Sequence, residues 1–167
     1  MVALTILIVS CCALLASVVS SMQLTRANEE KARASKAATA MIERMHTTPF
    51  NQIFASFNQD PADDPLGANL APGRDFDIPG LGPQAGDADG LAGQVQFPVT
   101  IDGAGVLSLR EDMAAPEFGM PRDLNGDGAI DGSNHSDDYL LLPVSVSVSW
   151  RGAGGDQTIT HTALLVE

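Results

Sequence analysis

The sequence predicts an α+β fold in which a long N-terminal helix packs on a small antiparallel β-sheet of about four strands. Three observations predict this. The chain holds 16 glycines and 10 prolines, yet the first proline is Pro49 and the first glycine is Gly67. Regular alternation of apolar and polar residues begins only after residue 94. The segment between these two parts is too rich in glycine, proline and aspartate to form a core.

The charge of the chain is unevenly distributed. The formal net charge is −12, but residues 1–45 carry five basic and three acidic residues, whereas the remainder carries four and eighteen. An acidic head repels phosphate backbones and attracts divalent cations, so we expect no nucleic-acid partner. The length of 167 residues suits one compact domain plus an anchor.

The N-terminal helix begins with an apolar run. Residues 2–19 are uncharged, and these 18 residues would extend about 27 Å as a helix, which is close to the hydrocarbon thickness of a bilayer. This part is therefore predicted to cross a membrane or to pack against apolar neighbours. Its predicted contact residues are Val2, Leu4, Ile6, Leu7, Ile8, Val9, Leu14, Leu15, Val18 and Val19.

Two other kinds of N-terminal segment also begin with an apolar run. A cleaved secretory signal would carry Lys or Arg before the apolar run, and this run has none. The segment from Ile8 to Cys11 fits the short pattern of a lipid-anchored protein, in which Cys11 becomes the modified first residue. Cys11 and Cys12 are adjacent in a helix and point about 100° apart, so they predict no disulfide framework.

The helix continues beyond the apolar run without a breaker. From Met1 to Met45 it would be about 68 Å long. Its second half, residues 21–45, is charged but carries an apolar stripe that needs a partner. The stripe consists of Ala34, Ala38, Met41 and Met45, widened by Ala37 and Ile42.

A second helix and a loop follow the long helix. The chain is therefore predicted to consist of the two helices (residues 1–57), the loop (58–93) and a head (94–167). Residues 50–57 are predicted to form a short helix whose aromatic face is buried, with Thr48 as its N-cap. Residues 58–93 contain twelve glycines or prolines and seven aspartates, so we expect an irregular surface loop.

The head, residues 94–167, is predicted to form the sheet, with its apolar face on the helix stripe. Pro98 confines the first strand to an edge or a bulge because proline cannot donate a ladder hydrogen bond. A turn is expected at Asp102 and Gly103. The expected strands cover residues 95–101, 106–110, 144–150 and 159–165.

One segment of the head, residues 121–138, has the spacing of a metal site. Residues 123–131 match the first nine positions of an EF-hand-type calcium loop, with Gly128 at the sixth. Position twelve holds Asn134 in place of the usual glutamate, so the last ligand must come from a later aspartate. An aspartate-rich turn without an ion is the alternative, but a cation would relieve the repulsion among five carboxylates. The predicted calcium ligands are Asp123, Asn125, Asp127, Ala129, Asp131, and Asp137 or Asp138.

The residue types that carry enzymatic chemistry are scattered. His46, His135 and His161 lie in unrelated segments, no cysteine lies outside the apolar run, and no phosphate-binding glycine motif is present. The sequence therefore predicts that the chain is not an enzyme and has no small-molecule substrate.

Two segments carry a family resemblance. The first ten residues, MVALTILIVS, resemble the N-terminal helix of type IV prepilins and type II secretion pseudopilins, with the minor pilins and minor pseudopilins closest. The segment from Pro143 to Trp150 resembles the last hairpin of that group. The family's leader peptide, cleavage site and glutamate would lie upstream of Met1. Many major pilins have glycine and proline in the membrane half of the helix, whereas this run has neither, so we expect a continuous helix.

The resemblance implies a structural subunit of an extracellular type IV pilus-like or pseudopilus filament. Identical or homologous subunits would pack through their N-terminal helices, after residence in the inner membrane, into a periplasmic or extracellular fibre. It also implies that calcium holds the loop before the final strands, where other pilins use a disulfide. The alternative is a monomeric, membrane-tethered or lipid-anchored calcium-binding interaction module. The choice between a surface pilus and a pseudopilus stays open at this point.

Overall fold

The structure, a computed structural model, describes residues 2–101 and 106–167. The turn expected at Asp102 and Gly103 lies outside the described residues. The elements are α1 (Val2–Thr47), α2 (Phe50–Phe57), β1 (Asp75–Phe76), β2 (Gly93–Gln96), β3 (Val99–Ile101), β4 (Leu107–Leu109), the 3-10 helix η1 (Pro116–Phe118), β5 (Leu141–Gly152) and β6 (Gly155–Val166).

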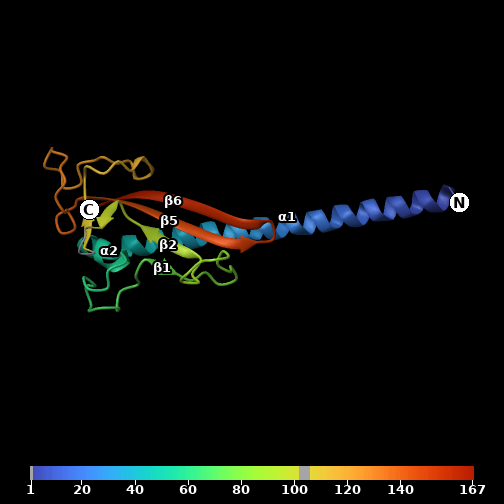
Figure 1. The fold of residues 1–167 in the computed structure, drawn as a ribbon, viewed down its shortest axis with the longest axis horizontal. Coiled ribbons are helices and arrows are strands. Elements are labelled where there is room, and N and C mark those ends of the chain that lie inside the picture. The colour runs from blue at the N-terminus through green and yellow to red at the C-terminus, as the bar shows by residue number, and fades with distance from the viewer. Residues whose placement is uncertain (1, 102–105) are drawn as a thin grey trace.

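Helix α1 is a single continuous helix of 46 residues, or about 69 Å at the standard rise. Its first half projects from the head, and its second half runs alongside the sheet (Figure 1). The continuity follows from a composition with no glycine or proline before Pro49. The predicted continuous helix is therefore what the structure shows, and it ends at Thr47.

The main sheet has four strands in the order β1-β2-β5-β6, all antiparallel. Strands β5 and β6 form a hairpin of two twelve-residue strands in which Gly152 pairs with Gly155 across a two-residue turn. The predicted α+β class, a long helix packed on a small antiparallel sheet, is thus confirmed.

The strands that form the main sheet are not all the ones predicted from the sequence. The strand expected over residues 95–101 is divided at Pro98, because proline has no N–H for the ladder. Strand β2, before Pro98, joins the main sheet, whereas β3, after it, pairs with β4 in a separate two-stranded sheet. The fourth strand of the main sheet is instead the two-residue β1, within the loop that follows α2.

The core lies between α1, α2 and the inner face of the hairpin. The α1 stripe of Ala34, Ala38, Met41 and Met45 is buried, as expected from its spacing. Thr48 does not cap α2: its hydroxyl donates to the Arg44 carbonyl at 3.2 Å, and Pro49 occupies the capping position. The hairpin and α2 contribute the buried side chains Val144, Val146, Val148, Trp150, Ile53, Phe54 and Phe57.

The close approach of α1 to the hairpin depends on small side chains. Ala38 is fully buried, whereas Ala40 lies two residues further on the exposed side. We predict that Ala38→Leu lowers the free energy of unfolding by about 1–3 kcal/mol, because the added volume must displace a packed strand. Ala40→Leu, the matched control, should leave it nearly unchanged. Chemical denaturation of the detergent-solubilised chain measures both, and equal effects would show that the α1 stripe is not closely packed.

Candidate metal centre

The predicted calcium loop is bent around its own carboxylates. Asp123 accepts hydrogen bonds from the amides of Gly126 (2.6 Å) and Gly128 (2.8 Å). Asp127 accepts one from the Ala129 amide at 2.7 Å. Gly126 and Gly128 have positive φ values of 77° and 88°, a conformation that glycine adopts without strain. These bonds turn the chain so that several acidic side chains gather on one loop.

Asp138 joins this loop from a later segment. The side-chain amide of Asn125 lies 3.3 Å from the Asp138 carboxylate and 3.5 Å from that of Asp127. The Asn125 amide thus lies between two carboxylates, which is a position that also suits a cation. Each carboxylate oxygen can accept more than one partner. The oxygen donors at this point are of the kind that Ca²⁺ prefers.

Glu111 anchors the loop to the head. It is 1% exposed. One carboxylate oxygen accepts from the amides of Leu124 (2.6 Å) and Asn125 (3.3 Å), and the other accepts from the Asp131 amide at 3.2 Å. A buried carboxylate that accepts three amide hydrogen bonds is strongly stabilised. Glu111 therefore ties both ends of the nine-residue loop to one point.

His135 lies next to this anchor and is 4% exposed. Its Nδ1 atom is 3.0 Å from Asp138, and its Nε2 atom is 3.3 Å from Asp131 and 3.8 Å from Glu111. A neutral imidazole has only one N–H, so two ring nitrogens that both face carboxylates favour a protonated or metal-bound ring. Glu111, Asp131 and His135 offer ligand atoms within 4.8 Å of one another, so this group could hold a metal ion.

The pKa directions agree with this arrangement. Burial lowers the pKa of His135, but hydrogen bonds to Asp131 and Asp138 and the nearby Glu111 charge outweigh it, so the net shift is upward. The pKa of Asp131 is lowered, chiefly by hydrogen bonds from Ser133 and then by His135. Both directions are those that a contact between the His135 imidazole and the Asp131 carboxylate produces.

The structure divides the predicted ligands into two groups that meet at Asp138. Asp123, Asn125, Asp127 and Asp138 belong to the bent loop. Asp131 instead turns toward Glu111 and His135. Ala129 and Asp137 are both exposed.

Two of the residues that surround the loop were not predicted from the sequence. Glu111 precedes Asp123 by twelve positions, so no local spacing reveals it. The only sequence signal for His135 is its position one residue after the twelfth loop position.

The apolar half of α1 forms the second feature of functional interest. An 18-residue window of this helix is apolar enough to cross a membrane, and none of it is buried against the head. The helix could therefore span a membrane. The predicted contact side chains Val2, Leu4, Ile6, Leu7, Ile8, Val9, Leu14, Leu15, Val18 and Val19 are 53% to 73% exposed.

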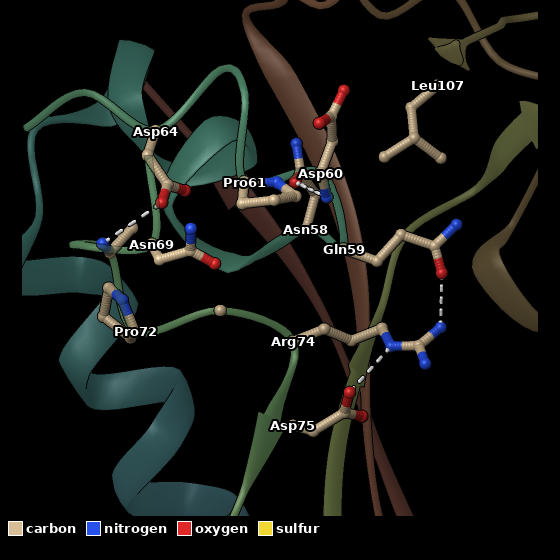
Figure 2. A pocket seen from close by; sticks show the side chains of 12 residues that line it. Asn58, Gln59, Asp60, Pro61, Asp64, Asn69, Pro72, Arg74, Asp75 and Leu107 are labelled. Atoms are coloured by element: carbon tan, nitrogen blue, oxygen red, sulfur yellow. Dashed lines mark hydrogen bonds and ion pairs between the residues drawn. The ribbon is translucent and has the colours of Figure 1, made fainter. Parts of the chain in front are cut away.

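A hollow of about 640 Å³ lies beside the loop that follows α2. Figure 2 shows the Arg74 guanidinium held by Gln59 at 2.6 Å and by Asp75 at 3.3 Å. Asp64 accepts a hydrogen bond from a backbone amide of the same loop, at 3.4 Å. These polar side chains are thus engaged with one another and with the loop backbone, and they hold the irregular segment in shape.

Comparison with protein-family models, with curated proteins and with solved structures finds no match for this chain.

The Glu111 anchor can be tested directly. We predict that Glu111→Ala lowers the free energy of unfolding by at least about 2 kcal/mol, because it removes the partner of three backbone amides. The matched control is Glu117→Ala, since Glu117 is exposed. Denaturant titration in chelator measures both. If the two variants lost the same stability, Glu111 would not be an anchor.

His135 predicts a pH dependence. Its folded pKa lies above the ordinary 6.5, so its contribution is fully present below pH 6.5 and is lost as pH rises through the folded value. The melting temperature of the metal-free chain should therefore fall as the pH rises above 6.5. His135→Gln should flatten this slope, and His46→Gln, which changes an exposed histidine, should not. If His135→Gln left the slope of melting temperature against pH unchanged, His135 would not be the group that causes the pH dependence.

Proposed function

We propose that this chain is a structural subunit of an extracellular filament of the type IV pilus or pseudopilus kind, and not an enzyme. The observation that carries the proposal is α1, whose second half is the core of a folded head while its first half is an exposed, uncharged helix. The resemblance of the first ten residues to type IV prepilins supports the same function.

The exposed half of α1 needs a cover. Burying one large apolar side chain contributes roughly 1.5–3 kcal/mol, and ten such side chains are exposed between Val2 and Val19. The described part of the head supplies no cover, because its hairpin already packs on the second half of α1. Lipid would cover the first half before assembly, and the same half of neighbouring subunits would cover it in a fibre.

This arrangement suits helical assembly of identical or homologous subunits. A continuous helix lets the apolar halves lie together along a fibre axis while the heads stay outside. The strongly acidic heads would then face solvent, where their charge keeps the fibre soluble. The subunit would reside in the inner membrane before assembly and in a periplasmic or extracellular fibre after it.

Electron microscopy of cells or membranes that express the assembly system tests the proposal. We predict fibres from the native chain and none from Leu14→Asp, because a carboxylate near the bilayer centre costs about 3 kcal/mol. Leu66→Asp is the control, since Leu66 is an exposed leucine of the loop that follows α2. Normal fibre yield from Leu14→Asp would contradict the proposal. Dispersed particles from the native chain would instead favour the membrane-tethered interaction module.

We further propose that the metal of the head is calcium. The bent loop offers carboxylate and amide oxygens at the spacing of a calcium loop, and Ca²⁺ takes six to eight oxygen ligands. The loop also controls the start of the hairpin, because the Leu124 carbonyl accepts the amides of Leu140 (2.7 Å) and Leu141 (2.9 Å). An ion that orders the loop would therefore fix the first residues of β5.

Calcium should stabilise the head by mass action, because it binds the folded loop and not the unfolded chain. We predict a higher melting temperature in millimolar calcium than in chelator, and a weaker effect of magnesium, which demands a tighter octahedral shell. Asp127→Ala should remove the calcium effect. Asp156→Ala, at the distant hairpin turn, should retain it. If calcium left the melting curve of the native chain unchanged, the loop would be an aspartate-rich turn without an ion.

A further inference from the structure

The tip of the β5–β6 hairpin lies against α1 close to the point where the uncharged part of the helix ends. The first charged residue of the chain is Arg26. Between the tip and the helix lies a hollow of about 360 Å³. Its lining residues are Ser20, Gln23, Leu24, Ala27, Ala153 and Gly154.

The tip is held at this level of the helix by Glu30. The Glu30 carboxylate accepts hydrogen bonds from the Trp150 indole N–H at 3.4 Å and from the Ala153 amide at 3.2 Å. The hairpin also approaches the helix closely here, because a side chain in place of Gly152 would collide with that carboxylate. The position of the tip along α1 is therefore fixed by specific contacts.

The length of the uncharged helix sets where the bilayer ends. Residues 2–25 carry no charge, and a hydrocarbon core of about 30 Å is crossed by about 20 helical residues. The charge of Arg26 keeps that residue out of the hydrocarbon, so the hydrocarbon ends on the N-terminal side of Arg26. The residues of α1 that face the tip begin at Ser20. The tip and the headgroup layer consequently lie at the same height on the helix.

We propose that the hairpin tip is a membrane-contact site that sits in the headgroup layer of the bilayer that α1 spans. The proposal rests on membrane anchoring by α1, which is part of the proposed function, but not on filament assembly. The tip suits this layer, because residues 152–155 are small and uncharged and its polar backbone can still reach water. Arg26 and Arg151 are exposed near the tip, where a guanidinium can pair with lipid phosphate.

The contact gives the head a second support. A single helix through a bilayer leaves the head free to tilt and rotate, whereas a second contact beside the helix restrains both motions. Because Glu30 fixes the tip to α1, the restraint passes directly to the sheet. The face of the head beside the tip would then be oriented relative to the membrane before assembly.

Depth-dependent fluorescence quenching in lipid nanodiscs tests this inference on the full chain. A fluorophore is attached to Ala153→Cys at the tip or to Ala62→Cys, both in a Cys11→Ser, Cys12→Ser background. Ala62 is an exposed alanine of the loop that follows α2, and α2 lies at the opposite end of the sheet from the hairpin turn (Figure 1). A third label on native Cys11, with Cys12→Ser, reports insertion of the helix. The quenchers are phosphatidylcholines with a spin label on the headgroup or in the middle of the acyl chain.

We expect headgroup quenchers to remove most of the fluorescence at position 153 and little at position 62, while mid-chain quenchers act at Cys11. If the label on Cys11 is quenched but the label at position 153 is quenched no more than the label at position 62, the tip does not contact the membrane. That result would overturn the tip contact and leave membrane anchoring by α1 intact. Absence of quenching at Cys11 would overturn anchoring and the tip contact together. Protection of position 153 only when fibres form would assign the hollow to a neighbouring subunit, which also contradicts the proposal.

Discussion

The packing of one helical stripe on one hairpin supports the rest of the structure. Ala34, Ala38, Met41 and Met45 of α1 are buried beneath the inner faces of β5 and β6. The two alanines allow the hairpin backbone to approach closely, and the two methionines add larger buried side chains to the same stripe. Since α1 has no break, the same helix that forms the core of the head also carries the exposed apolar half. Any force on that apolar half is therefore transmitted directly to the core.

The two ends of the hairpin are fixed by different chemistry. At its turn, Glu30 of α1 accepts hydrogen bonds from the strand and the tip. At its other end, the acidic loop binds the start of β5 through the Leu124 carbonyl, and Glu111 holds that loop. The acidic end gathers like charges, so its geometry is sensitive to protons and cations. The turn end depends on one carboxylate and on close approach at Gly152.

The parts of the fold that could be predicted from the sequence are those with local signals. The absence of glycine and proline predicts α1, the spacing of its stripe predicts the buried face, and the alternation from Val144 to Trp150 predicts β5. The pairing of β1 with β2 could not be predicted, because a two-residue strand at Asp75 and Phe76 has no periodicity. Pro98 predicts an edge strand or a bulge, but the separate two-stranded sheet that follows it depends on tertiary contacts.

The candidate site follows the same pattern. The spacing from Asp123 to Asp131 is local, so the sequence predicts the loop. Glu111 comes from a distant segment and is identified only by its three amide partners, and His135 only by the carboxylates around its ring. Long-range contacts of this kind carry no fixed sequence spacing, which is why the loop was predicted and its anchor was not.

An unbroken α1 should make its apolar half and the head one rigid unit. A distance measurement between two spin labels tests it most directly, with one label on native Cys12 in the apolar half and one on Thr160→Cys of β6, in a Cys11→Ser background. Pulsed electron paramagnetic resonance in lipid nanodiscs should give one narrow distance distribution, because no flexible joint separates the labels. A broad or bimodal distribution would show a hinge in α1 and contradict the claim.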